Sequence, residues 1–184
     1  MSMLKPAATL RIELLDVKPL VWRRFVVPAD IQLPKPHKAI QAVMGWDDEH
    51  PHQFSFAGTE YGTPSDEYPD DPTLSEKGVR LSKALGPGTQ FEYQYDFGDN
   101  WQHRIVVETM GNPDLTLTVP VCLAGENACP PEDVGGLTGY EEFREALADP
   151  KHEQHSDYRT WVGGIFDPAG FDVNAVNARL WAIR

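Results

Sequence analysis

Cysteine and long apolar stretches are scarce in this 184-residue sequence, which contains only Cys122 and Cys129. No apolar run approaches the roughly 20 residues that a membrane-spanning helix needs. The first residues also lack the continuous apolar stretch of a secretion signal. We therefore expect a cytoplasmic protein without a membrane span, in which a disulfide bond between the two cysteines is not expected.

Basic side chains are also few, with 16 lysines and arginines against 28 aspartates and glutamates, for a net charge of −12. Nucleic-acid-binding proteins usually carry a basic stripe, because each phosphate contact releases counterions. Here the longest basic run is Arg23-Arg24, so nucleic acid is not an expected partner. Acidic runs such as residues 47–49 and 132–133 are typical of solvated loops, with a cation site or a basic protein partner as the alternative.

Recognisable catalytic motifs are absent. The sequence has no P-loop, dinucleotide-binding glycine pattern, nucleophile elbow or His-Glu-x-x-His motif. Asp96-Phe97-Gly98 matches the magnesium-binding triplet of kinases, but neither a glycine-rich loop nor a His-Arg-Asp loop accompanies it. A hairpin turn accounts for this triplet, and whether the chain is an enzyme stays open.

Hydrophobic periodicity predicts one α+β domain over residues 1–184, a mostly antiparallel sheet of two hairpins plus extra strands packed with about three helices. Alternating apolar residues predict strands at 9–15, 20–27, 53–57, 91–97, 101–108 and 115–121. Helical spacing predicts helices at 35–44, 140–148 and 172–183. Residues 58–88 are rich in glycine, proline and acid, which indicates a long surface excursion with a short element near 79–85.

The hairpin over residues 91–108 gives the clearest local pattern. A three-residue loop at 98–100 predicts the cross-strand pairs Phe97–Trp101, Tyr95–His103, Tyr93–Ile105 and Phe91–Val107. In this register every large apolar side chain lies on one face, and a slip by one residue would turn half of them away. His103 then lies on the aromatic face, where we expect a hydrogen-bonded core histidine.

Two sets of side chains have the composition of a metal site. One is His50-Pro51-His52, which follows the acidic residues 47–49. The other combines Cys-x6-Cys with His-x2-His and offers four zinc ligands: Cys122, Cys129, His152 and His155. Their spacing matches no standard zinc finger, so packed reduced thiols and ordinary loop histidines remain the alternatives. Zinc is therefore the candidate cofactor.

Several segments together resemble the plasmid pRiA4b ORF-3-like family, which occurs on plasmids, in mobile elements and in prokaryotic chromosomes. They are VWRRFVVP (21–28), HKAIQAVMGW (37–46), YDFGDNW (95–101), CPPEDVGGLTGY (129–140) and the ending at 166–177. The chain departs from the family pattern at Pro36 and Pro51, where leucine is usual. The resemblance implies a fold and a mobile-element context but no established activity. The resolvase label of some members does not transfer, because a serine recombinase needs a nucleophilic serine among arginines and a −12 surface opposes DNA.

We expect a non-catalytic binding or accessory module associated with plasmids or mobile elements, with another protein as its partner. Its candidate surface comprises Trp46, His50, His52, Asp99, Trp101, Glu132 and Asp133, because polar loops fixed by glycine and proline join an aromatic sheet there. The alternative is a metal-dependent hydrolase or a zinc-stabilised domain. The hydrolase would use His50, His52 and Asp99 with Glu132 or Asp133. The structural zinc would be held by Cys122, Cys129, His152 and His155.

Overall fold

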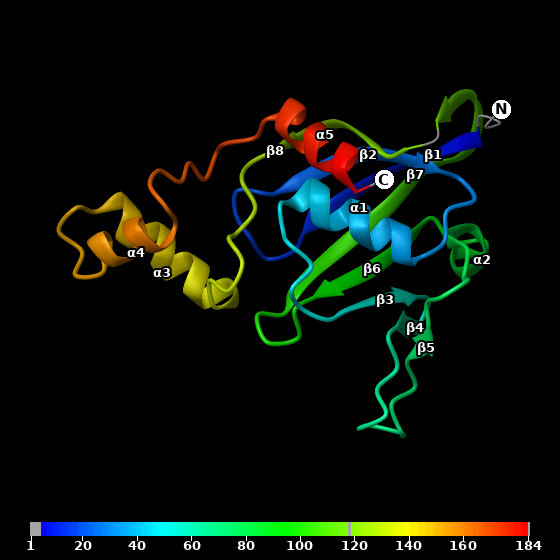
Figure 1. Ribbon diagram of the computed structural model, residues 1–184, viewed down its shortest axis with the longest axis horizontal. Coiled ribbons are helices and arrows are strands. Elements are labelled where there is room, and N and C mark those ends of the chain that lie inside the picture. Colours follow the sequence, from blue (N-terminus) through cyan, green and yellow to red (C-terminus); the bar gives the residue numbers. More distant parts are fainter. Residues whose placement is uncertain (1–4, 118, 184) are drawn as a thin grey trace.

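An eight-stranded sheet forms the body of the protein, with helices against it and beside it (Figure 1). The computed structural model describes residues 5–117 and 119–183. Along the chain the elements are β1 (Lys5–Leu14), β2 (Trp22–Pro28), α1 (Pro34–Met44), β3 (His52–Phe56), β4 (Thr59–Gly62), β5 (Leu74–Ser75), α2 (Leu81–Leu85), β6 (Gln90–Tyr95), β7 (Trp101–Leu117), β8 (Val121–Glu126), α3 (Gly136–Ala148), α4 (His155–Trp161) and α5 (Val173–Ala182). The strand order is β5-β4-β3-β6-β7-β1-β2-β8.

The predicted α+β class is confirmed, and the strand pairs are antiparallel apart from β4 with β5. The described chain has five helices rather than about three. The two additional helices, α2 and α4, have five and seven residues, too short for a full helical period to be visible. Residues 115–121 do not form the separate strand that was predicted, because β7 continues to Leu117, residue 118 lies outside the described residues, and β8 begins at Val121. No helix in the described part is long and apolar enough to cross a membrane.

Helix α1 forms where the sequence predicts it. Two prolines occupy its first turn, where a missing N–H costs little. Its apolar face is buried against the sheet through Ala39, Ile40, Val43 and Met44. Gly45 ends the helix in the left-handed conformation, with φ of 101°, and its N–H donates to the carbonyl of Gln41. The helix therefore delivers the chain directly to the loop at residues 46–51.

The predicted register of the β6–β7 hairpin is wrong by two residues. The observed pairs are Tyr95 with Trp101, Tyr93 with His103 and Phe91 with Ile105, so the loop has five residues, 96–100. Because side chains alternate along a strand, a shift of two keeps every residue on its face. The predicted aromatic face is accordingly buried, including both tyrosines and His103, with the exception of Phe97.

Asp96 is the physical reason for this longer loop. Its backbone has a positive φ of 56°, which takes it out of the strand. Its Oδ1 accepts hydrogen bonds from the N–H groups of Gly98 and Asp99, at 2.8 and 3.2 Å, an arrangement that favours a turn. Phe97 therefore lies in the loop, 51% exposed, instead of pairing with Trp101.

One edge of the sheet is closed by a side chain. Strand β8 has its outer edge beside α5, and Asn177 of that helix contacts the backbone of Cys122 in two places. The N–H of Cys122 donates to Asn177 Oδ1 at 2.8 Å, and Asn177 Nδ2 donates to the Cys122 carbonyl at 2.9 Å. The amide thus takes the place of a neighbouring strand at an otherwise open edge.

We expect Asn177→Ala to lower the free energy of unfolding by about 1–2 kcal/mol, because two backbone groups lose their partners. Urea denaturation followed by tryptophan fluorescence measures this change. The matched control is Asn174→Ala, at an exposed position of the same helix, with an expected change within about 0.5 kcal/mol. Equal stabilities for the two variants would contradict the role of Asn177.

Candidate functional site

A cleft of about 710 Å³ lies between α1, the loop before β3 and the excursion at residues 63–76. Three histidines reach its wall, namely His37 from α1, His50 from the loop and His52 from the first position of β3. Asp48 and Glu76 line the same cleft. The concentration of imidazoles and carboxylates in one concave region makes this cleft the candidate site.

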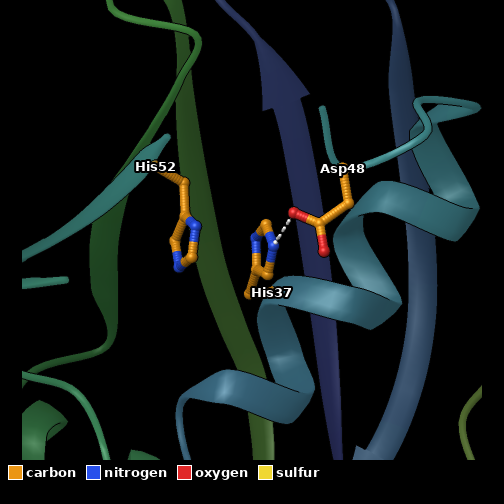
Figure 2. A group of neighbouring side chains, drawn as sticks. All are labelled: His37, Asp48 and His52. Carbon is orange, nitrogen blue, oxygen red and sulfur yellow. Dashed lines mark hydrogen bonds and ion pairs between the residues drawn. The ribbon is translucent and has the colours of Figure 1, made fainter. Parts of the chain in front are cut away.

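His37, Asp48 and His52 form a compact cluster at this wall (Figure 2). The Nε2 atom of His37 lies 2.6 Å from Oδ1 of Asp48. The imidazoles of His37 and His52 are stacked, with centroids 3.5 Å apart and planes within 6° of parallel. Each residue offers one nitrogen or oxygen, and these three atoms lie within 4.8 Å of one another. We name this group the inner cluster.

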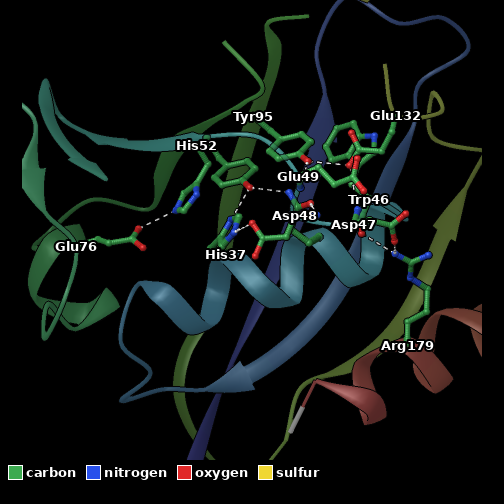
Figure 3. A network of polar contacts seen from close by, with 12 residues as sticks. His37, Trp46, Asp47, Asp48, Glu49, His52, Glu76, Tyr95, Glu132 and Arg179 are labelled. Carbon is green, nitrogen blue, oxygen red and sulfur yellow. Dashed lines mark hydrogen bonds and ion pairs between the residues drawn. The ribbon is translucent and has the colours of Figure 1, made fainter. Parts of the chain in front are cut away.

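The second nitrogen of each imidazole in the inner cluster has a buried partner. Nδ1 of His37 lies 2.8 Å from the Tyr93 hydroxyl, and Nε2 of His52 lies 2.9 Å from Oε2 of Glu76 (Figure 3). Both partners are buried. Metal-binding histidines characteristically have their remaining nitrogen held in this way, which fixes the ring and its tautomer.

Gln41 supports the same network from α1. Its Nε2 donates to the Tyr93 oxygen at 3.0 Å, and its Oε1 accepts from the backbone N–H of Asp48 at 2.9 Å. Because a hydroxyl both donates and accepts, Tyr93 can serve either tautomer of His37. The helix, the following loop and β6 are thereby held in one arrangement around the cluster.

Burial dominates the electrostatics of His37. Burial, with a smaller contribution from His52, lowers the pKa of His37 to about 4, although the neighbouring carboxylates of Asp48 and Glu76 act in the opposite direction. His37 is therefore neutral at physiological pH. A neutral imidazole with an available lone pair is the form that binds a metal ion.

A second group lies at the rim of the cleft, and we name it the rim cluster: His50, Asp96 and Asp133. Nε2 of His50 lies 2.7 Å from Oδ1 of Asp133 and 3.6 Å from Oδ2 of Asp96. Burial opposes protonation of His50, but the hydrogen bond to Asp133 and the charges of the surrounding carboxylates outweigh it and raise the pKa of His50.

The three loops that carry the predicted surface residues, 46–52, 98–101 and 129–136, meet around this rim. Oδ2 of Asp99 accepts from the N–H of Gly135 at 3.1 Å, and Oε1 of Glu132 accepts from the N–H of Asp47 at 3.0 Å. His50 and Asp133 come together as the hydrolase alternative requires. His52 instead belongs to the inner cluster, and Asp96 rather than Asp99 faces His50.

Trp46 and Trp101 do not belong to an exposed surface, contrary to the expectation. Each is 1% exposed, and their rings stack with centroids 6.2 Å apart. Trp46 also donates from Nε1 to the carbonyl of Pro130 at 3.0 Å. The apolar pattern of both flanking segments draws these indoles into the core, where they support the loops from beneath.

The four zinc ligands suggested by the sequence do not gather. In the ranges that the structure describes, the inner and rim clusters are the groups of three or more potential ligands, and neither contains Cys122, Cys129, His152 or His155. Both cysteines are free thiols, and burial raises the pKa of each. His155 uses its Nδ1 on the carbonyl of Ala146 at 2.8 Å, which holds α4 against the end of α3.

Sequence reasoning missed His37 and Glu76, and it included Asp48 only as one of the acidic residues 47–49. The sequence does contain a signal for His37. His37 and Gln41 lie on the same face of α1 as Ile40 and Met44, so two polar side chains occupy an otherwise apolar, buried face. Glu76 comes from the irregular excursion after β5, and nothing in its local sequence indicates that it approaches His52.

The fold and the two clusters define an α+β protein with a histidine- and carboxylate-lined cleft. The family model described as plasmid pRiA4b ORF-3-like protein matches residues 6–175, and the chain belongs to this family. It is 39% identical over 177 residues to the uncharacterized protein y4hQ of Sinorhizobium fredii (strain NBRC 101917 / NGR234), covering 95% of this chain and 91% of that protein. Among solved structures, it is similar to MM3350 from Methanosarcina mazei Go1, described as a protein of unknown function. That likeness has 37% identity and a TM-score of 0.82, covering 94% of this chain and 98% of the other.

His103 is a core histidine, as expected, and it gives stability a pH dependence. It is fully buried, its Nδ1 donates to the Tyr93 carbonyl at 3.0 Å, and burial lowers its pKa from 6.5 to about 4. The unfolded chain therefore binds a proton at higher pH than the folded chain. The free energy of unfolding keeps its full value above pH 6.5. As the pH falls from 6.5 towards 4, protonation of His103 in the unfolded chain lowers it by up to about 1.4 kcal/mol per pH unit.

Between pH 6.5 and 4.5 we expect His103→Gln to reduce the slope of the unfolding free energy against pH by up to about 1.4 kcal/mol per pH unit. Urea denaturation in EDTA at several pH values measures it. The control is His152→Gln, which replaces a half-buried histidine in a turn outside the sheet, and a change of slope confined to His103→Gln would support the prediction. An unchanged slope in His103→Gln would show that this histidine is protonated in the folded state as readily as in the unfolded state.

Proposed function

We propose that the protein is a metal-dependent hydrolase that binds one divalent transition-metal ion at the inner cluster. A single observation carries the proposal. His37, Asp48 and His52 present ligand atoms within 4.8 Å of one another at a cleft wall, and the other imidazole nitrogens are held by Tyr93 and Glu76. Fixed second nitrogens distinguish such a site from a chance meeting of polar side chains.

The ligand set indicates the class of ion. Two imidazoles and one carboxylate suit Zn²⁺, Fe²⁺, Co²⁺ or Mn²⁺ better than Ca²⁺ or Mg²⁺, which prefer oxygen. Three protein ligands leave a position for water, which is typical of catalytic rather than structural sites. Parallel stacked rings cannot both direct a lone pair at one ion, so binding is expected to part the stack of His37 and His52 and to displace the proton between His37 and Asp48.

The surrounding residues support hydrolysis. A bound ion of this class would act as a Lewis acid and lower the pKa of a coordinated water molecule. The cleft offers about 710 Å³ for a substrate, within the range of small-molecule sites. His50 lines the same cleft and is oriented by Asp133, so it is positioned to contact a substrate there. Glu76 holds the ring of His52 in place.

A non-catalytic binding module, cytoplasmic and associated with plasmids or mobile elements, is the second candidate function. One observation favours it, because the three loops meet and Phe97, about half exposed, lines the same cleft as the carboxylates of Asp48 and Glu76. An exposed ring beside acidic groups fits a basic protein partner. Under this candidate, Phe97→Ser would abolish partner binding without affecting metal content.

Metal titration tests the hydrolase proposal. After EDTA treatment, Zn²⁺ added to the protein should bind at the inner cluster, measured by calorimetry and elemental analysis. Asp48→Asn should weaken binding at the inner cluster by at least about 100-fold because a ligand is lost, and Glu76→Gln by about 10–100-fold because His52 loses its orienting partner. His152→Gln is the control and should bind like the unmodified protein.

Hydrolysis is then assayed with chromogenic ester and phosphodiester probes. Turnover by the metal-loaded protein that is abolished in Asp48→Asn would support the proposal. Zn²⁺ binding that is identical in Asp48→Asn, Glu76→Gln and the unmodified protein would overturn the inner cluster as the metal site. A loaded protein without turnover across these probes would favour the second candidate.

A further inference from the structure

The rim cluster has the geometry of a cation site of its own. The Nε2 atom of His50 lies 2.7 Å from an oxygen of Asp133 and 3.6 Å from an oxygen of Asp96. Two ligands of one ion, each at about 2.0–2.2 Å, lie at most about 4.4 Å apart. Both distances fall within that limit, so one ion can contact the imidazole and both carboxylates after small side-chain movements.

The carboxylate of Asp96 is oriented for such an ion. Its Oδ1 is occupied by the N–H groups of Gly98 and Asp99, and this leaves Oδ2 directed at His50. Asp133 comes from a different loop, just before α3, and approaches the same nitrogen from solvent, with 60% of its side chain exposed. An ion here would join the hairpin loop to the segment that leads into α3.

Glu132 supplies an independent observation. Its Oε1 accepts from the Tyr95 hydroxyl at 2.8 Å and from the N–H of Asp47 at 3.0 Å. Its Oε2 is buried and has no hydrogen-bond partner among the described residues. Glu132 is close enough to His50 for their charges to interact. A buried carboxylate oxygen without a donor is uncommon in folded proteins, and a neighbouring cation would satisfy it.

The local charge also calls for a cation. Asp96, Glu132 and Asp133 place three carboxylates around His50, and an imidazole that binds a metal ion is neutral and balances none of them. In the part of the chain described here, no lysine or arginine lies within ion-pair distance of these three residues. A divalent ion would balance two of these three charges.

We propose that His50, Asp96 and Asp133 form a second divalent-cation site at the rim of the cleft, with the charge of Glu132 beside it. One imidazole among carboxylates is a harder ligand set than the inner cluster, and it suits Mn²⁺ or Zn²⁺. The inference goes beyond the proposed function and does not depend on it, because the rim cluster shares no ligand with the inner cluster.

Mn²⁺ binding tests the rim site. Mn²⁺ is added to protein that has been treated with EDTA, and binding is measured as the loss of the electron paramagnetic resonance signal of the free ion. To isolate the rim site, the titration is made in the Asp48→Asn background, where the inner cluster lacks a ligand. We expect one equivalent of Mn²⁺ to bind in this background. Adding His50→Gln or Asp133→Asn should weaken this binding at least tenfold, and because Asp133 is largely exposed its substitution leaves the fold intact.

The matched control removes two exposed carboxylates from α3, as Glu141→Gln and Glu142→Gln together, and should leave the Mn²⁺ equivalent unchanged. A loss of binding in this control that matches the loss in Asp133→Asn would indicate diffuse attraction by acidic charge and would overturn the rim site. Absence of Mn²⁺ binding in the Asp48→Asn background, while the unmodified protein binds one equivalent, would overturn the rim site and leave the inner cluster standing. No binding in either protein would overturn both.

Discussion

Two tyrosine hydroxyls on one strand hold both histidine clusters in place. Tyr93 and Tyr95 lie two residues apart on β6, so both side chains enter the same buried face. The hydroxyl of Tyr93 contacts His37 of the inner cluster, and that of Tyr95 donates to Glu132 beside the rim cluster. Burial of the aromatic face of β6 and β7 stabilises the fold. It therefore also fixes the positions of the inner cluster and the rim cluster relative to β6.

The loops around the cleft are ordered by the same core. Trp46 begins the loop after α1, packs against Tyr95 with ring centroids 4.8 Å apart, and donates to the carbonyl of Pro130. Three segments that are distant in sequence thus meet at one indole. This arrangement leaves Asp48, His50 and His52, at alternate positions, to approach the cleft while the intervening backbone is tied down.

Much of the fold could be predicted from the sequence because its signals are local. The helix ending at Gly45 and the buried face of the β6–β7 hairpin both follow from periodicity. The register of the β6–β7 hairpin did not follow from periodicity, because an alternation of period two looks the same after a shift of two residues. The turn formed by Asp96 determined it instead. The candidate site was predicted in part: His50 and Asp133 meet, whereas the contact of His52 with Glu76 depends on tertiary structure that no local pattern encodes.

We infer that His37, Asp48 and His52 hold a divalent metal ion, and that the two imidazoles leave their stacked arrangement to bind it. Anomalous diffraction at the zinc edge, from crystals grown with Zn²⁺, tests it most directly. We expect an anomalous peak bonded to His37, Asp48 and His52, with the two imidazoles no longer parallel. Rings that stay stacked at 3.5 Å, without a peak beside them in zinc-saturated crystals, would contradict it.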